Sequence, residues 1–152
     1  MREIIDAQRR FFETGKTLDV KFRIAALKRL KQSIKAFEPR ILDALKADLG
    51  KSATEAYMTE VGMTLAELSF MLKHAKKFAR KRSVKTPLAQ FYAKTYELRV
   101  PYGVALVMSP WNYPFMLTME PLIDAIAAGN TVVVKPSAYA PETARVLADV
   151  LA

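Results

Sequence analysis

The sequence predicts an α/β fold in which a helical N-terminal segment precedes alternating strands and helices. Two observations support this prediction. Residues 1–82 repeat apolar side chains at helical spacing, whereas residues 103–152 read strand, helix, strand, helix. Between them, residues 83–102 are rich in aromatic and β-branched side chains, as strands are. We therefore expect a helical segment, then a linker with one strand, and then a βαβα unit.

The composition is that of a globular protein of about one domain, with 152 residues, 51% hydrophobic and 26% charged. No apolar run approaches the roughly 20 residues of a membrane span, and the charged N-terminus is unlike a secretory signal. The sequence contains no cysteine, so it has no disulfide, thiolate metal ligand or cysteine nucleophile of its own. We expect a cytoplasmic protein with no metal site.

Capping residues divide the helical segment. We expect a short first helix, beginning around Ile4 and Ile5, that ends at Gly15. Asp19 has the residue type of an N-cap and predicts the start of a second helix there. The apolar stripe of this second helix, at spacing four, is Phe22, Ala26, Leu30 and Ile34.

Further helix start and stop signals follow in the helical segment. Pro39 predicts a new helix start, because proline fits the first turn of a helix, and Gly50 predicts the end of that element. Ser52 and Glu55 have the spacing of a capping box. The helix after this box has the clearest amphipathic stripe of the chain. Its apolar positions are Tyr57, Val61, Leu65, Leu68, Leu72, Ala75 and Ala79.

Two apolar runs define the βαβα unit. Residues 104–108 and 131–135 read as strands buried on both faces. Residues 115–128 predict a helix between them, bent at Pro121, and Pro141 opens a final helix. A strand, a helix and a parallel strand in this order imply a right-handed crossover.

A pair of parallel strands needs neighbours, because its open edges and apolar faces are otherwise uncovered. The sequence stops where a third strand of a nucleotide-binding half would follow. Residues 91–100 alternate weakly and predict one further, partly exposed strand. We therefore expect a truncated Rossmann-like cofactor-binding domain, represented by its first βαβα, within the N-terminal part of a larger protein.

The formal net charge of +9 leaves two interpretations open. Its densest source is residues 73–85, which contain seven lysines and arginines and no acid. Such a run could bind a polyanion such as nucleic acid or an anionic membrane. It could equally be a solvated helix end, where cations suit the negative end of the helix dipole. We favour the helix end, because no nucleic-acid motif accompanies the run.

Two loops occupy the position where open α/β sheets bind ligands, the carboxyl ends of the strands. They read "SPWNYP" (109–114) and "KPSAYAP" (135–141), and no G-x-G-x-x-G fingerprint connects the first strand to its helix. The amide of Asn112 is flanked by two prolines and could stabilise an oxygen that becomes negative during a reaction. The alternative is that Asn112 caps the following helix through its side-chain oxygen.

Two other residues of these loops are open to two interpretations. Lys135 ends the second strand and could donate to ribose hydroxyls or phosphate, or it could simply extend into water. Trp111 is the only tryptophan and could line a ligand cleft or pack in the core.

The loops and their surroundings resemble the aldehyde dehydrogenase superfamily, especially forms similar to class 3 enzymes. The segments that carry the resemblance are "RVPYGVALVMSPWNYPF" and "PLIDAIAAGNTVVVKPS", with "VKTPLAQF" and "LKADLGKSATEAYMTEVG" upstream. Together they cover essentially the whole chain. The resemblance implies oxidation of an aldehyde to an acid with NAD or NADP, through a cysteine nucleophile and a thioester that water hydrolyses.

The resemblance also implies roles for individual residues. Asn112 corresponds to the family's oxyanion-hole asparagine, Trp111 to a residue in the wall of the cofactor cleft, and Lys135 to a ribose-contacting lysine. The backbone of Met108 and Ser109 would line the cofactor groove, and Ser137 would help to shape the pocket. The strand at residues 91–100 corresponds to the family's oligomerisation segment, which implies a homo-oligomer.

Two departures from the family pattern qualify these implications. Many NAD-preferring members have a glutamate three residues after the lysine, whereas this sequence has Ala138, which favours tolerance of NADP. The family's nucleophile and general base lie further along the chain than this sequence reaches, so we expect the chain alone to be inactive. The alternatives are an interaction module that self-associates or pairs with another subunit, and a basic helical polyanion binder.

Overall fold

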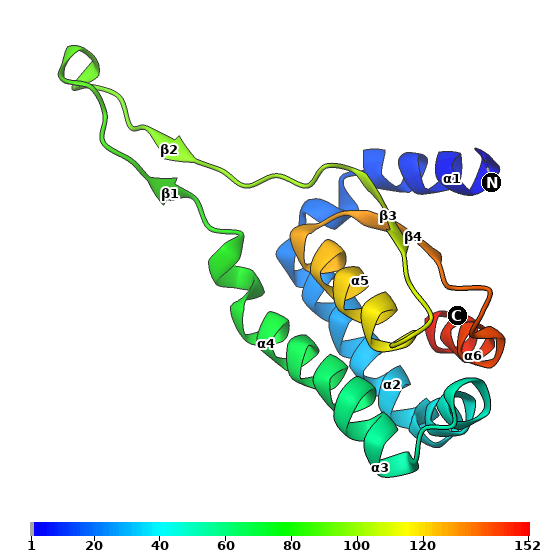
Figure 1. The fold of residues 1–152 in the computed structure, drawn as a ribbon. Helices are drawn as coiled ribbons and strands as arrows, with labels where there is room; N and C mark the ends of the chain where they lie inside the picture. The colour runs from blue at the N-terminus through cyan, green and yellow to red at the C-terminus, as the bar shows by residue number, and fades with distance from the viewer. Residues whose placement is uncertain (1) are drawn as a thin grey trace.

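A computed structural model describes residues 2–152 and contains a helical segment followed by two small sheets (Figure 1). The helical segment runs from the N-terminus to the base of an extended hairpin. Its elements are α1 (Arg2–Glu13), η1 (Lys16–Leu18), α2 (Val20–Leu49), α3 (Ala53–Ala56), η2 (Tyr57–Val61, a π-helical turn) and α4 (Gly62–Phe78).

The remainder of the chain forms a two-stranded antiparallel hairpin and then a parallel strand–helix–strand unit. The hairpin comprises β1 (Arg82–Ser83), η3 (Leu88–Gln90) and β2 (Tyr96–Glu97). The unit that follows comprises β3 (Val104–Met108), α5 (Met116–Ala128), β4 (Thr131–Lys135) and α6 (Pro141–Leu151). The expected order of strand, helix, parallel strand and helix is therefore confirmed.

Three local start and stop signals of the helical segment, at Asp19, Gly50 and Ser52, are confirmed. The Asp19 carboxylate accepts a hydrogen bond from the Lys21 amide at 2.9 Å, which makes it the N-cap of α2. Gly50 ends α2 with φ of 69°, the left-handed conformation that favours glycine at a helix end. The hydroxyl of Ser52 accepts from the Glu55 amide at 3.2 Å and caps α3.

The predicted helix start at Pro39 is wrong, because α2 continues through this residue as one helix of 30 residues. Proline removes one hydrogen bond from the helix ladder and normally disfavours the interior. Here buried side chains on both sides of it, including Ile34 and Ile41, share one apolar core. Their common packing keeps the two halves on one helical path.

The helix expected after Ser52 contains a π-helical turn, which the sequence pattern did not predict. Residues Tyr57–Val61 form this turn between α3 and α4. A π turn holds an extra residue and therefore changes which side chains face inward. Tyr57 is 41% exposed, although the predicted stripe placed it in the core, whereas the charged side chain of Glu60 is fully buried.

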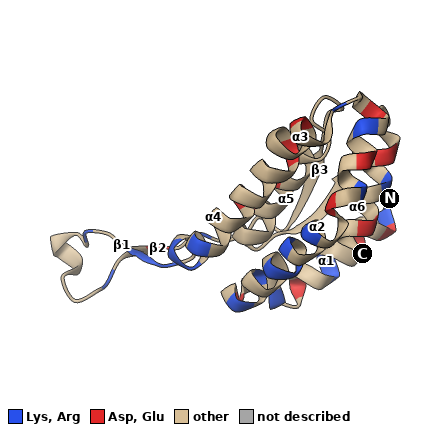
Figure 2. Cartoon of the chain, turned by 90° about the horizontal axis from the view of Figure 1, so that it is seen from below, with Lys and Arg blue, Asp and Glu red and all other residues tan. Residues whose placement is uncertain are grey.

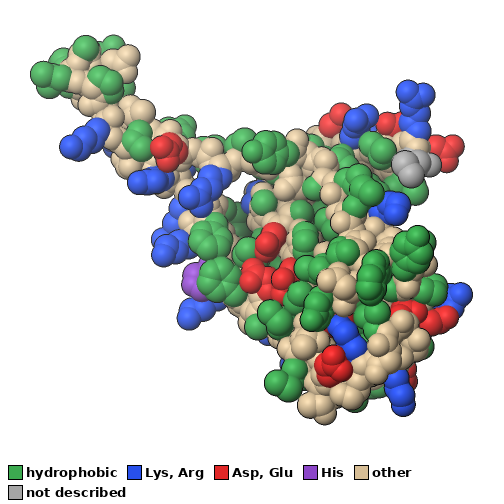
Figure 3. Space-filling view, in the orientation of Figure 1, with side chains coloured by type: hydrophobic (Ala, Val, Ile, Leu, Met, Phe, Trp, Pro, Cys, Tyr) green, Lys and Arg blue, Asp and Glu red, His purple; other side chains and the backbone are tan. Residues whose placement is uncertain are grey.

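The strand predicted at residues 91–100 is much shorter than expected. Only Tyr96 and Glu97 form β2, paired with β1, and the chain from Leu88 to Ala93 is a turn at the tip of the hairpin. In Figure 1 this hairpin projects away from the helices, and in Figure 3 its tip is covered with hydrophobic side chains. Without a second layer to pack against, alternating side chains do not hold a longer strand pair.

One apolar core joins the helical segment to the parallel unit. Helix α5 contacts both parallel strands and also α2 and α4, while α6 packs along α2 (Figure 1). The largest fully buried side chains of this core are Leu27, Ile34, Ile41, Leu45, Leu68, Phe115, Met119, Ile123 and Leu147. The parallel unit therefore folds onto the helices rather than beside them.

The prediction that both parallel strands are buried on both faces is wrong. In β4, Val132, Val133 and Val134 are only partly buried, and β3 departs further. Val107 is buried, but Leu106 and Met108 on the opposite face are 61% and 64% exposed. Helix α1 covers only the beginning of the strands, where the Gln8 carbonyl accepts from the hydroxyl of Thr131. The remainder of that face is an open apolar surface.

Arg23 ties the helical segment to the end of α5. Its guanidinium donates to the carbonyls of Thr17, Leu18 and Ala127 at 2.5, 3.1 and 3.3 Å. Burial lowers the pKa of this guanidinium, and the charge of Asp19 opposes that shift. Carbonyls at helix ends lack partners within the helix, so a planar cation with several donors satisfies them together.

We predict that Gly129→Ala destabilises the protein more than Gly50→Ala does. Both glycines have positive φ, 98° and 69°, so each substitution costs about 1–2 kcal/mol of backbone strain. A Cβ at Gly129 would lie 2.6 Å from the anchored Arg23 guanidinium, whereas one at Gly50 meets nothing within 4 Å. Urea unfolding should show roughly 1–3 kcal/mol of additional loss for Gly129→Ala. Equal losses would contradict the close approach to Arg23.

Candidate functional site

The carboxyl ends of β3 and β4 meet at one edge of the parallel sheet. Met108 pairs with Lys135 in register, and the Ser109 amide donates to the Lys135 carbonyl at 3.3 Å. Three of the residues that the sequence singled out therefore lie side by side. Two loops, residues 109–115 and 136–140, continue from this edge to α5 and α6.

The loop after β4 leaves Lys135 accessible. Its side chain is exposed, and so is Ala138. The hydroxyl of Ser137 accepts from the Tyr139 amide at 3.2 Å, which closes a tight turn. An exposed lysine beside a small side chain and a hydroxyl could contact a polyhydroxylated ligand such as a ribose.

The loop after β3 presents Trp111 and Asn112 to solvent. Trp111 is 54% exposed and so is not a core residue. Asn112 is exposed too, and within residues 2–152 its side-chain amide makes no hydrogen bond with protein. The alternative that Asn112 caps the following helix is therefore wrong. Its two N–H donors are free to meet a ligand.

Glu60 caps α5 in place of Asn112. One oxygen of its carboxylate accepts from the backbone amides of Phe115 and Met116 at 2.8 and 3.2 Å. A negative charge at a helix N-terminus satisfies unpaired N–H groups and interacts favourably with the helix dipole. The capping side chain belongs to a residue 55 positions before Phe115 in the chain.

Lys51 joins this cap to the loop. Its ammonium lies 2.5 Å from the second carboxylate oxygen of Glu60 and 3.4 Å from the carbonyl oxygen of Asn112. It also lies 4.0 Å from the centre of the Tyr113 ring, within the range of a cation–π contact. The side chains of Lys51 and Glu60 are only 9% and 0% exposed, so this is a buried ion pair.

The sequence alone does not single out Lys51 or Glu60. They are nine residues apart, and no motif connects a lysine and a glutamate at that spacing to a loop beyond residue 108. The one available signal is that Glu60, a charged residue with no evident role in the pattern, directly precedes Val61 of the apolar stripe. A buried charge implies a partner, but the pattern does not identify it.

A second long-range carboxylate caps α6. Asp48 accepts from the amides of Glu142 and Thr143 at 3.2 and 2.7 Å, and from the Thr143 hydroxyl at 2.7 Å. The N-termini of both helices that follow the parallel strands are thus occupied by carboxylates. Neither is open to a phosphate, which agrees with the absence of a glycine-rich fingerprint in the sequence.

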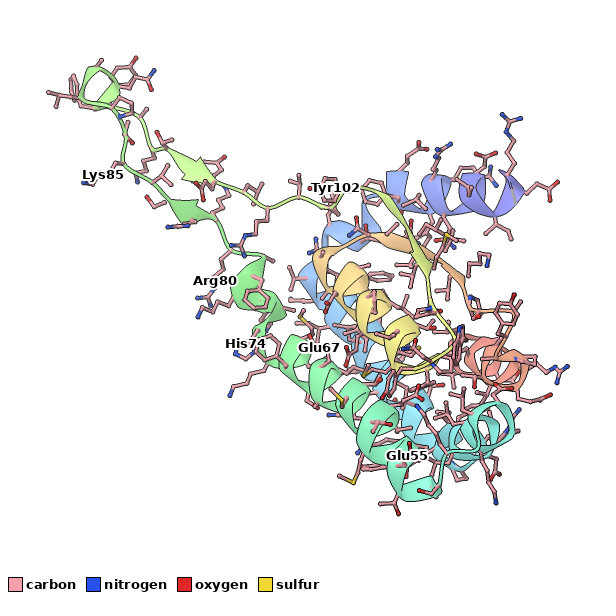
Figure 4. All side chains as sticks on the ribbon, viewed as in Figure 1. Glu55, Glu67, His74, Arg80, Lys85 and Tyr102 are labelled. Carbon is pink, nitrogen blue, oxygen red and sulfur yellow. The ribbon has the colours of Figure 1, made fainter. Side chains whose placement is uncertain are left out.

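The carboxylates with raised pKa values lie away from this edge, between α4 and α5. Asp124 has its pKa raised to about 6, chiefly by partial burial and then by the charge and hydrogen bond of Glu67. Partial burial and the charge of Glu67 also raise the pKa of Glu120. Figure 4 labels Glu67 on α4, on the side that faces α5. This acidic cluster belongs to helix packing.

The basic run at residues 73–85 covers the end of α4 and the base of the hairpin (Figure 2). Lys76 and Lys77 lie in the last turn of α4, where cations suit the helix dipole. His74 stacks between Phe70 and Phe78, with ring centres 4.2 and 5.9 Å away. Figure 4 places His74, Arg80 and Lys85 along this side of the molecule.

Residues 2–152 contain neither a helix suited to spanning a membrane nor a cluster suited to holding a metal ion. None of their helices combines the length and the apolar character needed to cross a membrane. The same residues contain no group of three or more histidine, aspartate or glutamate side chains placed to hold a metal ion.

These features define an α/β protein with a pair of partly exposed loops at the carboxyl edge of its parallel strands. The sequence profile of the aldehyde dehydrogenase family matches residues 1–152. The chain therefore belongs to the aldehyde dehydrogenase family.

Known relatives share this segment. The 4,4'-diaponeurosporen-aldehyde dehydrogenase of Staphylococcus aureus is 48% identical over 137 residues, which cover 90% of this chain and 30% of the relative. The dimeric, NADP-preferring aldehyde dehydrogenase of Canis lupus familiaris is 40% identical over 150 residues, covering 98% and 33%. A substrate-bound Staphylococcus aureus AldH structure superposes with a TM-score of 0.95 at 44% identity, covering 99% and 33%. The chain thus spans about a third of the length of these proteins.

We predict that Asp124→Asn becomes more stabilising, relative to the parent chain, as pH rises. A carboxyl whose pKa is raised in the folded state contributes stability below its unfolded value, 3.8, and loses it as pH passes 6. Thermal unfolding should show the advantage of the variant growing between pH 4 and pH 7. The gain should not exceed about 1 kcal/mol, because Asp124 remains exposed to water.

Asp6→Asn on α1 is the control for this experiment, because Asp6 faces Arg9 rather than another carboxylate. No growing advantage should appear for Asp6→Asn over the same pH range. An Asp124→Asn difference that is constant from pH 4 to pH 7 would rule out the proposed effect of the acidic cluster.

Proposed function

We propose that this chain supplies the N-terminal part of an NAD(P)-dependent aldehyde dehydrogenase, which oxidises an aldehyde to a carboxylic acid. The observation that carries the proposal is the free amide of Asn112, in a loop fixed by buried charges at the carboxyl edge of the sheet. Membership of the family supports it. We also propose the first βαβα of a Rossmann-like cofactor-binding domain for residues 103–152.

In this proposal Asn112 donates hydrogen bonds to the aldehyde oxygen as that oxygen becomes negative. Donors held in place before the reaction need no rearrangement when charge develops, which is why they lower the barrier. The nucleophile must come from outside this sequence, because the sequence contains no cysteine. The chain alone is therefore a part of an active site and performs no oxidation.

The described residues fit the ribose part of a nicotinamide dinucleotide better than its phosphates. Lys135 and Ser137 offer donors at the sheet edge, with Met108, Ser109 and Trp111 beside them. When bound, the nicotinamide accepts the hydride. Both helix N-termini are occupied by carboxylates, so the phosphates must be held elsewhere.

The small side chain of Ala138 leaves the site without a carboxylate that would repel a 2′-phosphate. A relative described as NADP-preferring supports this.

We predict that the chain alone forms no NAD(P)H when an aldehyde is added. A chimera that joins residues 1–152 to the remainder of the staphylococcal relative should be active, because that relative covers the same segment. In the chimera, Asn112→Ala should lower kcat by about 10²–10³, the usual effect of losing one oxyanion donor. Turnover is followed by nicotinamide absorbance. Oxidation by the isolated chain, or full kcat in the Asn112→Ala chimera, would refute the assignment.

We also propose that the hairpin of residues 82–97 is a self-association surface. Leu88, Phe91 and Tyr92 at its tip are 90%, 82% and 82% exposed (Figure 3). Large apolar side chains gathered on a projecting element are typical of a surface that contacts another chain. The relative described as dimeric supports an oligomer. The same surface would serve a non-catalytic interaction module.

We predict that replacing Leu88, Phe91 and Tyr92 with serine lowers the average mass of the chain in solution. Light scattering behind size-exclusion chromatography should show the parent chain gaining mass with concentration and the triple variant remaining monomeric. Gln90→Ala is the matched control, because it changes the same turn without removing apolar surface. If the triple variant associates as strongly as the parent chain, the hairpin tip is not the contact.

A further inference from the structure

We propose that Lys51 and Glu60 are positioning residues for the amide of Asn112. They lie in the helical segment, far along the sequence from the loop. The inference deepens the proposed function, since it assigns the groups that hold the oxyanion donor in place. Its physical basis is the set of contacts that the buried ion pair makes with residues 112–116.

The loop has few restraints of its own. Pro110 and Pro114 have no N–H group, and within the described chain the amides of Trp111, Asn112 and Tyr113 make no backbone hydrogen bond. The loop is bonded at its ends. The Ser109 amide donates to a carbonyl of β4, and the Thr118 hydroxyl bonds to the Ser109 hydroxyl and the Pro114 carbonyl. The Tyr113 carbonyl accepts from the Leu117 amide in the first turn of α5. Prolines limit φ, but they do not fix where the amide of Asn112 lies relative to the sheet edge.

The ion pair supplies the missing restraints from both sides of Asn112. Lys51 donates to the Asn112 carbonyl and contacts the ring of Tyr113. Glu60 holds the amides of Phe115 and Met116. Because the two side chains also bind each other, the start of α5 and the carbonyl of Asn112 are both anchored to the same buried ion pair.

Stability alone does not explain this arrangement. A buried ion pair costs desolvation, and well-packed apolar side chains of similar volume often stabilise a protein as well or better. Apolar side chains, however, could neither accept from the helix amides nor donate to the carbonyl of Asn112. What the pair provides beyond packing is directional bonding to the loop, and it does so while leaving the Asn112 side chain unbonded.

The chain offers an internal comparison, because it contains two asparagines, Asn112 and Asn130. Asn130 donates to the Ala125 carbonyl at 3.2 Å and accepts from the Gly103 amide at 3.0 Å, away from the ion pair. In the chain labelled with [15N]asparagine, Lys51→Met should shift or broaden the backbone and side-chain NMR signals of Asn112. The signals of Asn130 should stay in place, and Lys51→Arg, which keeps the charge, should restore those of Asn112.

Glu60→Gln tests the other half of the pair with little change in shape. The amides of Phe115 and Met116 should exchange with solvent at least about tenfold faster, because a charged acceptor becomes neutral. Asp48→Asn is the matched control, since it weakens the equivalent cap of α6 without touching the loop. It should leave the Asn112 signals unchanged while speeding exchange at Thr143.

Two results would overturn the inference. One is an unchanged Asn112 spectrum in both Lys51→Met and Glu60→Gln. The other is an equal disturbance of the Asn112 signals by Asp48→Asn. That result would mean that the ion pair only stabilises the fold in general. If Lys51→Met does not fold, Glu60→Gln and Lys51→Arg decide the question. None of these readouts needs turnover, so they can succeed even if Asn112→Ala leaves kcat of the chimera unchanged and the proposed function fails.

Discussion

The structure depends on two carboxylates that reach from the helical segment to the helices of the strand–helix unit. Glu60 binds the first amides of α5, and Asp48 binds those of α6. A helix N-terminus carries unpaired N–H groups and partial positive charge, so a buried start without an acceptor is costly. With both starts anchored, the apolar faces of α5 and α6 are held against α2 and α4. The direction of the two loops at the sheet edge follows from that placement.

The parts of the fold that the sequence predicted are those specified by neighbouring residues. Asp19 and Gly50 act within one turn of their own helix, so residue type and position were enough to identify them. Pro39 was misread because its local preference for a helix start is overridden by a core that both halves of α2 share. The strand at residues 91–100 was overestimated for the opposite reason, because its alternation has no packing partner in the chain.

The candidate site likewise has features that the sequence predicts and features that it does not. Asn112 and Lys135 could be placed at one edge from the order of strands and helices, since parallel strands end together. The function of Asn112 could not be decided, because capping and ligand binding need the same residue type at the same point. The structure excludes the capping alternative, because Glu60 takes the cap and Lys51 balances the charge of Glu60. Contacts across 55 and 61 residues leave no local trace in a sequence.

The long-range caps bear on how such proteins can diverge. A strand–helix unit moved by recombination into another scaffold, without the helices that carry Asp48 and Glu60, would begin two buried helices with no acceptor for their first amides. Residues 103–152 are thus unsuited to transfer on their own, even though their strand and helix order resembles that of a separate module. The helical segment and the parallel unit would have to be transferred together, because hydrogen bonds from Asp48 and Glu60 join them.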